Sequence, residues 1–365
     1  MRQSKWLRGV LAASCALPVA GTLLSLTRRP HWIFRMWDFP RVQLAALAAI
    51  GGLGLSIGGR RRDRPLVAAA GAVIAWQLSH IHTYTRFHRR TVKRVRKRDA
   101  EQCITVLMTN VRMENERHEL VLETIAREDP DVVLAVEVDA RWDEALTPLG
   151  QRYPYSVRHP RDNWYGMVLY SKLELIDPRI EFLVQDDIPS IQTRLRLRSG
   201  VELTLHGLHP RPPEPIRNQP SSPRDAELVI VGRAIGDDRH GPTIVAGDLN
   251  DVAWSPTSEL FVRLSGLLDP RAGRGFYNTY NANNPLFRYP LDHVFHSNHF
   301  KLVRIERQPW VGSDHFPMLI ELQYEPHAAE EQDESHEKPG DQHEAQARLE
   351  QEAHDAATGA DRPRE

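Results

Sequence analysis

Three apolar stretches that contain no Lys, Arg, Asp or Glu crowd the first hundred residues, at positions 10–26, 42–59 and 66–81. Each is flanked by arginines, and each is close to the roughly 17–25 residues that a helix needs to cross a bilayer. Their many small residues also let neighbouring helices pack closely in a membrane. We therefore expect residues 1–82 to form about three transmembrane helices.

Two alternatives stay open for this segment. The first stretch follows Arg2, Lys5 and Arg8, and a basic start before an apolar run is also typical of a cleaved signal peptide. The second and third stretches have the composition of a helical hairpin buried in a soluble domain. The three arginines at 60–62, between those two stretches, favour membrane spans.

Charge is divided unevenly along the chain, although the net charge is only -1. Residues 1–100 contain 19 Lys/Arg and 3 Asp/Glu, and many of the basic residues lie in the segment 83–102. Basic flanks stay on the cytoplasmic side, so this segment favours a cytoplasmic position for residues 103–325, in a multi-pass protein of a bacterial-type inner or plasma membrane. We interpret 83–102 as a basic linker, which suits either an anionic lipid surface or solvent.

The end of the chain has a different composition. Residues 328–365 contain 4 Lys/Arg and 12 Asp/Glu and almost no large apolar side chain. Such a segment cannot bury enough apolar surface to offset the entropy of ordering. We therefore expect residues 326–365 to form a disordered acidic tail.

Between these ends, residues 103–325 alternate between strand and helix patterns. Strands are expected at 104–109, 131–136, 166–170, 173–183, 193–197, 201–208, 243–246, 291–296 and 316–322. Helices are expected at 116–128, 225–235 and 257–264. Ser199-Gly200 between two adjacent strands indicates a hairpin, so the sheet is not purely parallel. This mixture predicts a layered α/β domain.

Polar residues gather where the predicted strands end. Asp248 and Asn250 come after the strand at 243–246, and two residues that are two apart at a strand end can point to the same side. Such a pair can bind a cation through the carboxylate and a substrate oxygen through the amide. An ordinary turn is the alternative, because Gly, Asp and Asn are turn formers.

A second group lies near the end of the domain. Asp314-His315 comes just before the last strand, and Asp292 opens the strand before it. A carboxylate beside an imidazole suits a metal ligand next to a base. If Asp292 reaches His315, it fixes the tautomer of the imidazole. We interpret His293 and His206 as structural histidines.

Asn110 and Glu137, at the ends of the first two strands, complete a set of carboxylates and amides without a thiolate. The two cysteines, Cys15 and Cys103, offer no zinc pattern. Hard oxygen ligands prefer Mg²⁺ or Mn²⁺ over zinc.

These motifs carry a resemblance to a known family. They occur along the chain in the order Asn110, Glu137, His209, Asp248-Leu249-Asn250, Asp292-His293, Ser313-Asp314-His315. Over residues 103–325 the chain resembles the endonuclease/exonuclease/phosphatase superfamily, which includes DNase I and exonuclease III. The resemblance implies an α/β fold, a four-layer α/β sandwich with two central mixed β-sheets.

The resemblance also implies roles for the site residues. Glu137 is then the principal ligand of a divalent metal, with Asn110 and Asp314 near it. Carried over in the same way, Asp248 orients or deprotonates the attacking water, and Asn250 holds the phosphate. His315, oriented by Asp292, acts as base or stabilises charge on the phosphorane, and His209 contacts the phosphate.

The expected activity is hydrolysis of a phosphodiester or phosphomonoester by in-line attack of water, in a membrane-anchored enzyme. A nuclease on DNA or RNA is one alternative, and an inactive membrane scaffold is another. Residues 101–327 contain 24 Lys/Arg and 33 Asp/Glu, whereas nucleases gain affinity from basic contacts to phosphates. Arg158, Arg161, Arg211 and Arg217 are candidates for a local basic patch. The proline-rich stretch 210–223 lies where the family varies its substrate loops, so a lipid, a small molecule or a nucleic acid stays open as substrate.

Overall fold

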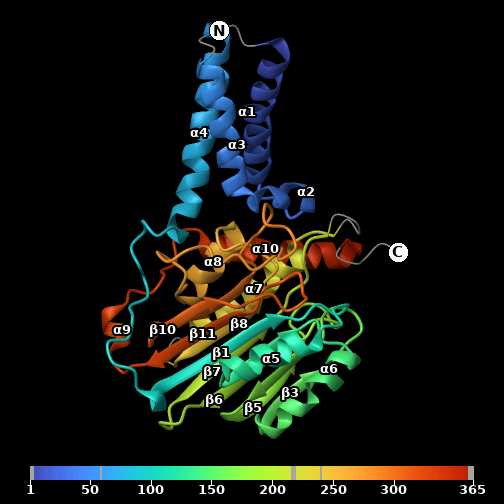
Figure 1. Ribbon diagram of the computed structural model, residues 1–365, viewed down its shortest axis with the longest axis vertical. Coiled ribbons are helices and arrows are strands. Elements are labelled where there is room, and N and C mark those ends of the chain that lie inside the picture. The colour runs from blue at the N-terminus through green and yellow to red at the C-terminus, as the bar shows by residue number, and fades with distance from the viewer. Residues whose placement is uncertain (1–3, 58–59, 215–218, 239–240, 361–365) are drawn as a thin grey trace.

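The computed structural model describes residues 4–57, 60–214, 219–238 and 241–360 (Figure 1). Its centre is a pair of mixed β-sheets. The first has the strand order β10–β11–β1–β2–β4–β3, and the second has the order β5–β6–β7–β8–β9. The pairs β1–β2 and β7–β8 are parallel, and the other neighbours are antiparallel. The predicted hairpin at Ser199-Gly200 is confirmed as the β6–β7 pair.

The strands of the first sheet are β1 (Cys103–Asn110), β2 (Val132–Val136), β3 (Tyr155–His159), β4 (Met167–Ser171), β10 (Phe300–Arg307) and β11 (Met318–Tyr324). Those of the second are β5 (Glu174–Glu181), β6 (Ser190–Arg196), β7 (Glu202–Leu208), β8 (Thr243–Asp248) and β9 (Asp292–His296). The strands β3 and β10 were not predicted from the sequence.

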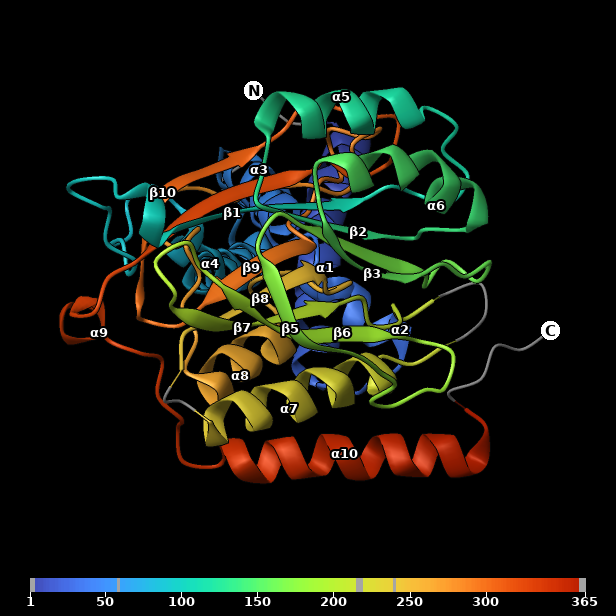
Figure 2. The ribbon, with the colours of Figure 1, turned by 90° about the horizontal axis from the view of Figure 1, so that it is seen from below.

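Helices cover the outer faces of both sheets (Figure 2). The helices α5 (His118–Glu128) and α6 (Ala140–Leu146) lie on the first sheet, and α7 (Ser222–Asp237) and α8 (Pro256–Ser265) lie on the second. One apolar core lies between the sheets, and one more lies between each sheet and its helices. The prediction of two mixed sheets flanked by helices is confirmed.

The central strand β2 shows why its sequence is apolar throughout. Val132, Leu134 and Val136 point into the core between the sheets, while Val133 and Ala135 point into the core under α5 and α6. Since alternate residues face opposite sides, a strand covered on both faces has to be a continuous apolar run. Each large side chain buried in this way contributes about 1.5–3 kcal/mol.

The N-terminal segment forms an upright helical bundle on one end of the sandwich (Figure 1). It consists of α1 (Lys5–Leu26), α3 (Arg41–Ile57) and α4 (Arg64–Ile81), with the short α2 (Trp32–Arg35) at its base. Among the described helices, α1 alone is long and apolar enough to cross a membrane, and Trp32–Asp38 with Arg41–Ile57 qualifies only if this bent pair counts as one span. A signal sequence or a core helix meets the same criterion.

A buried polar cluster fixes the base of the bundle to the sandwich. Asp38 accepts a hydrogen bond from Ser25 of α1 (2.6 Å) and forms ion pairs with Arg35 (3.1 Å) and Arg41 of α3 (3.1 Å). Its carbonyl oxygen accepts a hydrogen bond from the indole of Trp254 in the sandwich (2.8 Å). Because buried charges are stable only when paired, this cluster holds α1, α2 and α3 in one arrangement above the strand ends.

The basic segment 83–102 packs against the domain and is not the free linker that its composition predicted. Val92 is fully buried in the core between the sheets, and Val95 N–H donates to the carbonyl of Leu302 in β10 (3.1 Å). The guanidinium of Arg98 pairs with Glu321. The segment therefore runs along the edge of the first sheet, where Val92 is buried and most of its neighbours in the chain are exposed.

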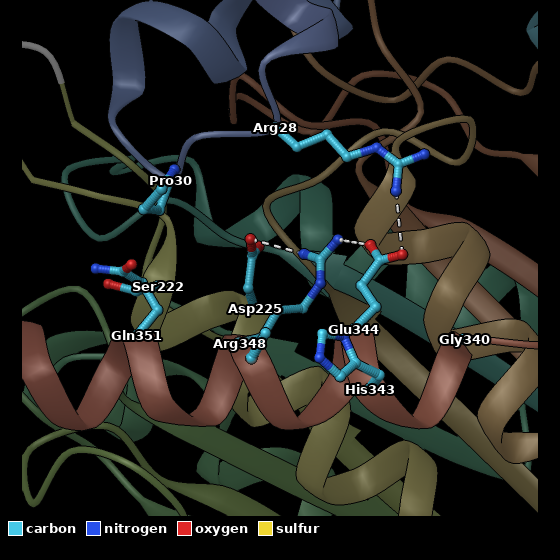
Figure 3. Close-up of a pocket in the computed structure, with 10 residues that line it drawn as sticks. Arg28, Pro30, Ser222, Asp225, Gly340, His343, Glu344, Arg348 and Gln351 are labelled. Carbon is cyan, nitrogen blue, oxygen red and sulfur yellow. Dashed lines mark hydrogen bonds and ion pairs between the residues drawn. The ribbon is translucent and has the colours of Figure 1, made fainter.

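The expected disordered tail is also replaced by ordered structure. The short α9 (Ala328–Glu331) precedes α10 (Asp341–Thr358), which lies outside α7 (Figure 2). Arg348 of α10 pairs with the buried Asp225 of α7 (2.9 Å), and Arg28 reaches Glu344 of α10 (3.1 Å) (Figure 3). The helix α10 is held on the domain by ion pairs and by one fully buried side chain, Ala345. Its low apolar content therefore did not predict a helix.

Replacing Arg348 by methionine is expected to lower the free energy of unfolding by about 1–3 kcal/mol, because a mostly buried charged hydrogen bond is lost. The more exposed partner of α10, Arg28, provides the matched control. Its replacement by methionine is expected to change stability by less than about 1 kcal/mol. Denaturant unfolding of the full chain in detergent measures both, and equal effects would show that Arg348 does not hold α10.

Candidate active site

Eight polar residues predicted from the sequence lie at neighbouring strand ends of the two sheets. Asn110 is the last residue of β1, and Glu137 comes directly after the parallel strand β2. Asp248 ends β8, and Asp292 begins β9 directly opposite it. The other four lie in adjoining loops and are His209, Asn250, Asp314 and His315. All eight are buried or half-buried.

Hydrogen bonds and one close contact connect five of the predicted residues into a network. The Nδ1 of His315 donates to Asp292 (2.8 Å), and its Nε2 lies 3.5 Å from Asp248. The amide of Asn110 donates to both Glu137 (2.7 Å) and Asp248 (3.1 Å). Asp248 is therefore the centre of the network, between the first sheet and the imidazole.

The turn after β8 holds Asn250 in place. The backbone N–H of Asn250 donates to the carboxylate of Asp248 (2.9 Å), and its side-chain amide donates to the carbonyl of Pro210 (2.9 Å). Its left-handed backbone (φ 51°), like that of Glu137 (φ 63°), is uncommon outside glycine and costs energy that the surroundings must offset. The preceding Gly247 is required, since a Cβ there would lie 1.9 Å from a carbonyl oxygen of β7.

His209 forms the opposite wall. Its Nε2 is 3.9 Å from the carboxylate of Asp248, and its ring lies against Tyr165 (5.4 Å between centroids). Burial lowers the pKa of His209 to about 4, so its imidazole is neutral at neutral pH. A neutral ring can donate one hydrogen bond to a substrate oxygen without adding charge.

The acidic groups are crowded into a site with little water. Burial raises the pKa of Glu137 to about 7, with a further contribution from the nearby carboxylates of Asp314 and Asp248. Burial also raises the pKa of Asp248. Burial alone lowers the pKa of His315, but Asp292 and Asp248 outweigh it and raise the pKa to about 10. Surplus negative charge around Glu137 is the electrostatic environment that attracts a cation.

Two groups of atoms offer ligands to a divalent ion. The ligand atoms of Asp248, Asp292 and His315 lie within 4.8 Å of one another. In that group, however, Asp292 and His315 already bond to each other. Around Glu137, His315 lowers the pKa of the carboxyl group while Asp314 and Asp248 raise it, and the carboxylate and amide character of these oxygens fits a hard ion such as Mg²⁺.

The structure adds residues that sequence analysis did not single out. The ring of Tyr280 lies 4.9 Å from that of His315. Arg271 donates to Nδ1 of His293 (2.7 Å), whose Nε2 contacts the carbonyl of Asp251 (2.9 Å). His293 is therefore structural, as we interpreted it. Neither Tyr280 nor Arg271 belongs to a recognisable motif, so only the fold brings them to the site.

Three of the four arginines of the candidate basic patch contact other side chains of the protein. Arg158 and Arg211 form ion pairs with aspartates (2.6 and 2.8 Å), and Arg161 contacts a histidine ring (3.3 Å). The fourth candidate, Arg217, lies outside the described residues.

A cavity of about 670 Å³ opens from the site toward the base of the bundle. Glu137, Asp248 and His315 line it. Trp32, Met36 and Phe287 line it as well. The polar network and the N-terminal segment therefore share one cavity, which no sequence pattern predicted.

Comparisons with known proteins agree with this arrangement. Residues 109–315 match the Endonuclease/Exonuclease/phosphatase family, and no protein of curated function matches the sequence. Among solved structures, a conserved protein of unknown function from Enterococcus faecalis V583 is 15% identical with a TM-score of 0.51, covering 61% of this chain and 100% of its own.

Two further structures are similar to the same extent. The catalytic domain of human Nocturnin is 18% identical (TM-score 0.50), and the match covers 61% of this chain and 95% of that domain. The endonuclease/exonuclease/phosphatase from Bacteroides vulgatus is 16% identical (TM-score 0.50), covering 61% and 99%. At such identities the structures support the fold, and the sequence match supports the family. This chain belongs to the endonuclease/exonuclease/phosphatase family.

Proposed function

We propose that this protein is a divalent-metal-dependent phosphoesterase that hydrolyses a phosphodiester or phosphomonoester by in-line attack of water. Hydrolysis of phosphoesters is the chemistry of the family. The observation that carries the proposal is the network joining Asn110, Glu137, Asp248, Asp292 and His315, which are far apart in sequence. An imidazole and an amide link three carboxylates in this network. Burying charged groups costs free energy, so packing of the core does not explain such a cluster.

Glu137 is the proposed principal ligand of Mg²⁺ or Mn²⁺, with Asn110 and Asp314 beside it. The carboxylates of Asp314 and Asp248 near Glu137 support this choice. When bound there, the ion would neutralise charge on the phosphoryl oxygens. Asn110 keeps the carboxylate of Glu137 in place by its hydrogen bond (2.7 Å).

Asp248 is the residue that we assign to the attacking water, because its carboxylate lies between His209 and His315. The amide of Asn250 uses one N–H for the carbonyl of Pro210 and keeps a second N–H for a phosphoryl oxygen. His209 supplies a neutral donor from the opposite wall. These three side chains orient the substrate and the water relative to one another.

His315 is held by Asp292 with its Nε2 toward the reaction centre. Because its pKa is raised to about 10, the imidazole of His315 is protonated at neutral pH, and a positioned cation there can stabilise the negative charge that develops on the phosphoryl group. Asp292 does not itself face the substrate in this assignment. It is a positioning residue, which fixes the ring and its tautomer.

We further propose that α1, α3 and α4 anchor the enzyme in a membrane, with the catalytic domain at the surface. Large apolar side chains are exposed along the bundle, including Trp6, Leu53 and Ile57, which are 77%, 69% and 85% exposed. Water is an unfavourable environment for so much apolar surface. A 22-residue helix such as α1 is about 33 Å long, which matches the hydrocarbon core of a bilayer.

The anchor predicts that the full-length protein sediments with membranes and is released by detergent but not by salt or alkaline carbonate. Salt and carbonate remove proteins that are held by charge alone, whereas apolar helices stay in the bilayer. Ultracentrifugation and immunoblotting of the fractions measure the distribution. Full-length protein in the supernatant without detergent would show that the bundle is not an anchor.

A substrate panel tests the proposed activity. The full-length protein in detergent is incubated with a generic chromogenic phosphodiester, phospholipids, plasmid DNA and single-stranded DNA, each with Mg²⁺, with Mn²⁺ and with a chelator. Hydrolysis that requires the metal supports the proposal. Preferred cleavage of DNA would make the protein a nuclease. If no substrate is hydrolysed, the remaining hypothesis is an inactive membrane scaffold.

A further inference from the structure

The cavity at the site is larger and more apolar than a phosphate group needs. Its volume of about 670 Å³ is in the range of pockets that enclose whole organic ligands. Its lining combines the network of Asp248 and His315 with Trp32, Met36 and Phe39 of the N-terminal segment. A phosphate at the network would therefore have its substituent against an apolar wall.

We propose that the substrate is a phosphate ester carried on an apolar chain, which enters this cavity from the plane of the bilayer. This inference rests on the proposed phosphoesterase function and on the proposed anchor. It assigns Trp32, Met36 and Phe287 as the residues that bind the chain and select for it.

The rim of the cavity supports entry from a membrane. Met36 and Phe287, which line the cavity, are 46% and 52% exposed, and Ile33 and Leu286, each next in the chain to a lining residue, are 42% and 73% exposed. Two of them belong to the segment between α1 and α3, and two belong to the loop before β9. Since isolated exposed apolar residues are normal but clusters mark interaction sites, this rim is suited to lipid.

Specific contacts fix the rim at the level of the base of the bundle. The side chain of Gln43 in α3 donates to the carbonyl of Leu286 (2.7 Å). The ring of Phe39 packs edge-to-face on Tyr289 (5.6 Å between centroids). In a membrane the bundle would therefore place Leu286 and Phe287 at the interface, where a lipid phosphate also lies.

The charge of the cavity disfavours a nucleic acid. Among the described residues that line it there is no Lys or Arg. A bound polynucleotide places several phosphates on the protein and gains affinity mainly from basic contacts to them. One phosphate on an apolar chain needs only the reaction centre and the apolar wall.

A chain-length series tests this inference. The substrates are 4-nitrophenyl phosphodiesters that carry an ethyl, octyl or dodecyl group, and nitrophenol release is measured for the full-length protein in phosphatidylcholine vesicles with Mg²⁺. We expect kcat/KM to rise with chain length. Partition of the ester into the vesicles also raises the rate, so comparison with variants in the same vesicles is needed to isolate the contact with the protein.

Phe287→Ala is the test variant, and Phe87→Ala is its matched control, because Phe87 is fully exposed and does not line the cavity. We expect Phe287→Ala to lower kcat/KM for the dodecyl ester by about tenfold and for the ethyl ester by less than about twofold, since only the long chain reaches the wall. Phe87→Ala is expected to match the wild type on all esters. Met36→Gln, on the other side of the wall, is a second variant with the same expected pattern, and neither residue is buried.

The outcomes separate this inference from the function on which it rests. If no ester, including the ethyl ester, is cleaved in a metal-dependent way, the proposed function is wrong. If the ethyl ester is cleaved but Phe287→Ala and Met36→Gln lower all rates alike, or no more than Phe87→Ala does, the enzyme is a phosphoesterase without a chain site. Faster cleavage of plasmid DNA than of the dodecyl ester, unchanged in Phe287→Ala, also overturns the inference.

Discussion

Replacement of Glu137 by glutamine is expected to lower metal-dependent hydrolysis by about 10³-fold or more, while the protein remains folded. Glutamine has nearly the same shape, and its carbonyl oxygen can still accept the hydrogen bond from Asn110. The variant lacks the negative charge that a divalent ion requires, and loss of such electrostatic stabilisation is usually the largest single effect in catalysis. The rate with the best substrate of the panel, at saturating Mg²⁺, measures the loss.

Glu144→Gln is the matched control for this prediction. Glu144 lies on the exposed side of α6, away from the strand ends, so the same chemical change there is expected to leave the rate within about twofold. Circular dichroism and the unfolding midpoint establish that both variants are folded. Full activity of Glu137→Gln would remove Glu137 from the metal site.

Sequence analysis found most of the well-buried strands, together with the partly exposed edge strand β5. The central strand β2 is a continuous apolar run because both of its faces are covered. By contrast, β3 and β10 lie at the edges of the first sheet. Water contacts part of an edge strand, so β3 and β10 carry Arg, Lys and Glu among their apolar residues, and this pattern was not recognised as strand. The seven-residue helix α6 is too short for a helical period to be evident.

The site residues were accessible to sequence analysis for a different reason. Asn110, Glu137, Asp248 and Asp292 lie at the ends of strands that could be identified, and the ends of paired strands meet at one edge of a sheet. The strand pattern therefore explains each pair of residues, and the packing of the two sheets on each other brings the pairs together. Their roles in the reaction do not follow from the strand pattern and remain proposals.

The apolar wall of the cavity could not be found in this way. Trp32, Met36 and Phe39 are more than seventy residues from the nearest site residue, and they lie between the first two apolar stretches, in a segment for which no structure was predicted. Only the docking of the bundle through Asp38 and Trp254 brings them to the strand ends. Contacts of this kind depend on tertiary packing, which cannot be inferred from the spacing of apolar residues along a short stretch of sequence.

The ordered helix α10 shows a similar limit. Its segment has few large apolar residues, and low hydrophobicity with high charge is the pattern of disorder. Arg348 and Asp341, however, find charged partners on α7 and α8 that are already fixed by the core. Order in this tail therefore comes from partners far away in sequence.

The pair His315 and Asp292 is expected to behave as one unit. Replacement of either residue alone, by His315→Ala or Asp292→Asn, is expected to lower the rate by about 10²–10⁴-fold, the usual effect of a positioned acid–base group. Asp292 contributes by holding the imidazole through its hydrogen bond to Nδ1 (2.8 Å), so a ring that is absent gains nothing from it. The double variant is therefore expected to be little slower than His315→Ala alone.

Measured kcat values for the two single variants and the double variant decide between coupled and independent action. Asp251→Asn is not a suitable control, since Asp251 is buried in its own ion-pair network with Arg224 (3.5 Å) and its loss threatens the fold. Asp237→Asn, at the end of α7, makes the same chemical change outside the site and should leave kcat unchanged. If the effects of the single variants multiply in the double variant, Asp292 acts independently of His315. Its carboxylate would then serve the reaction directly or stabilise only the start of β9, because a residue that works through the imidazole cannot lower the rate further once the imidazole is gone.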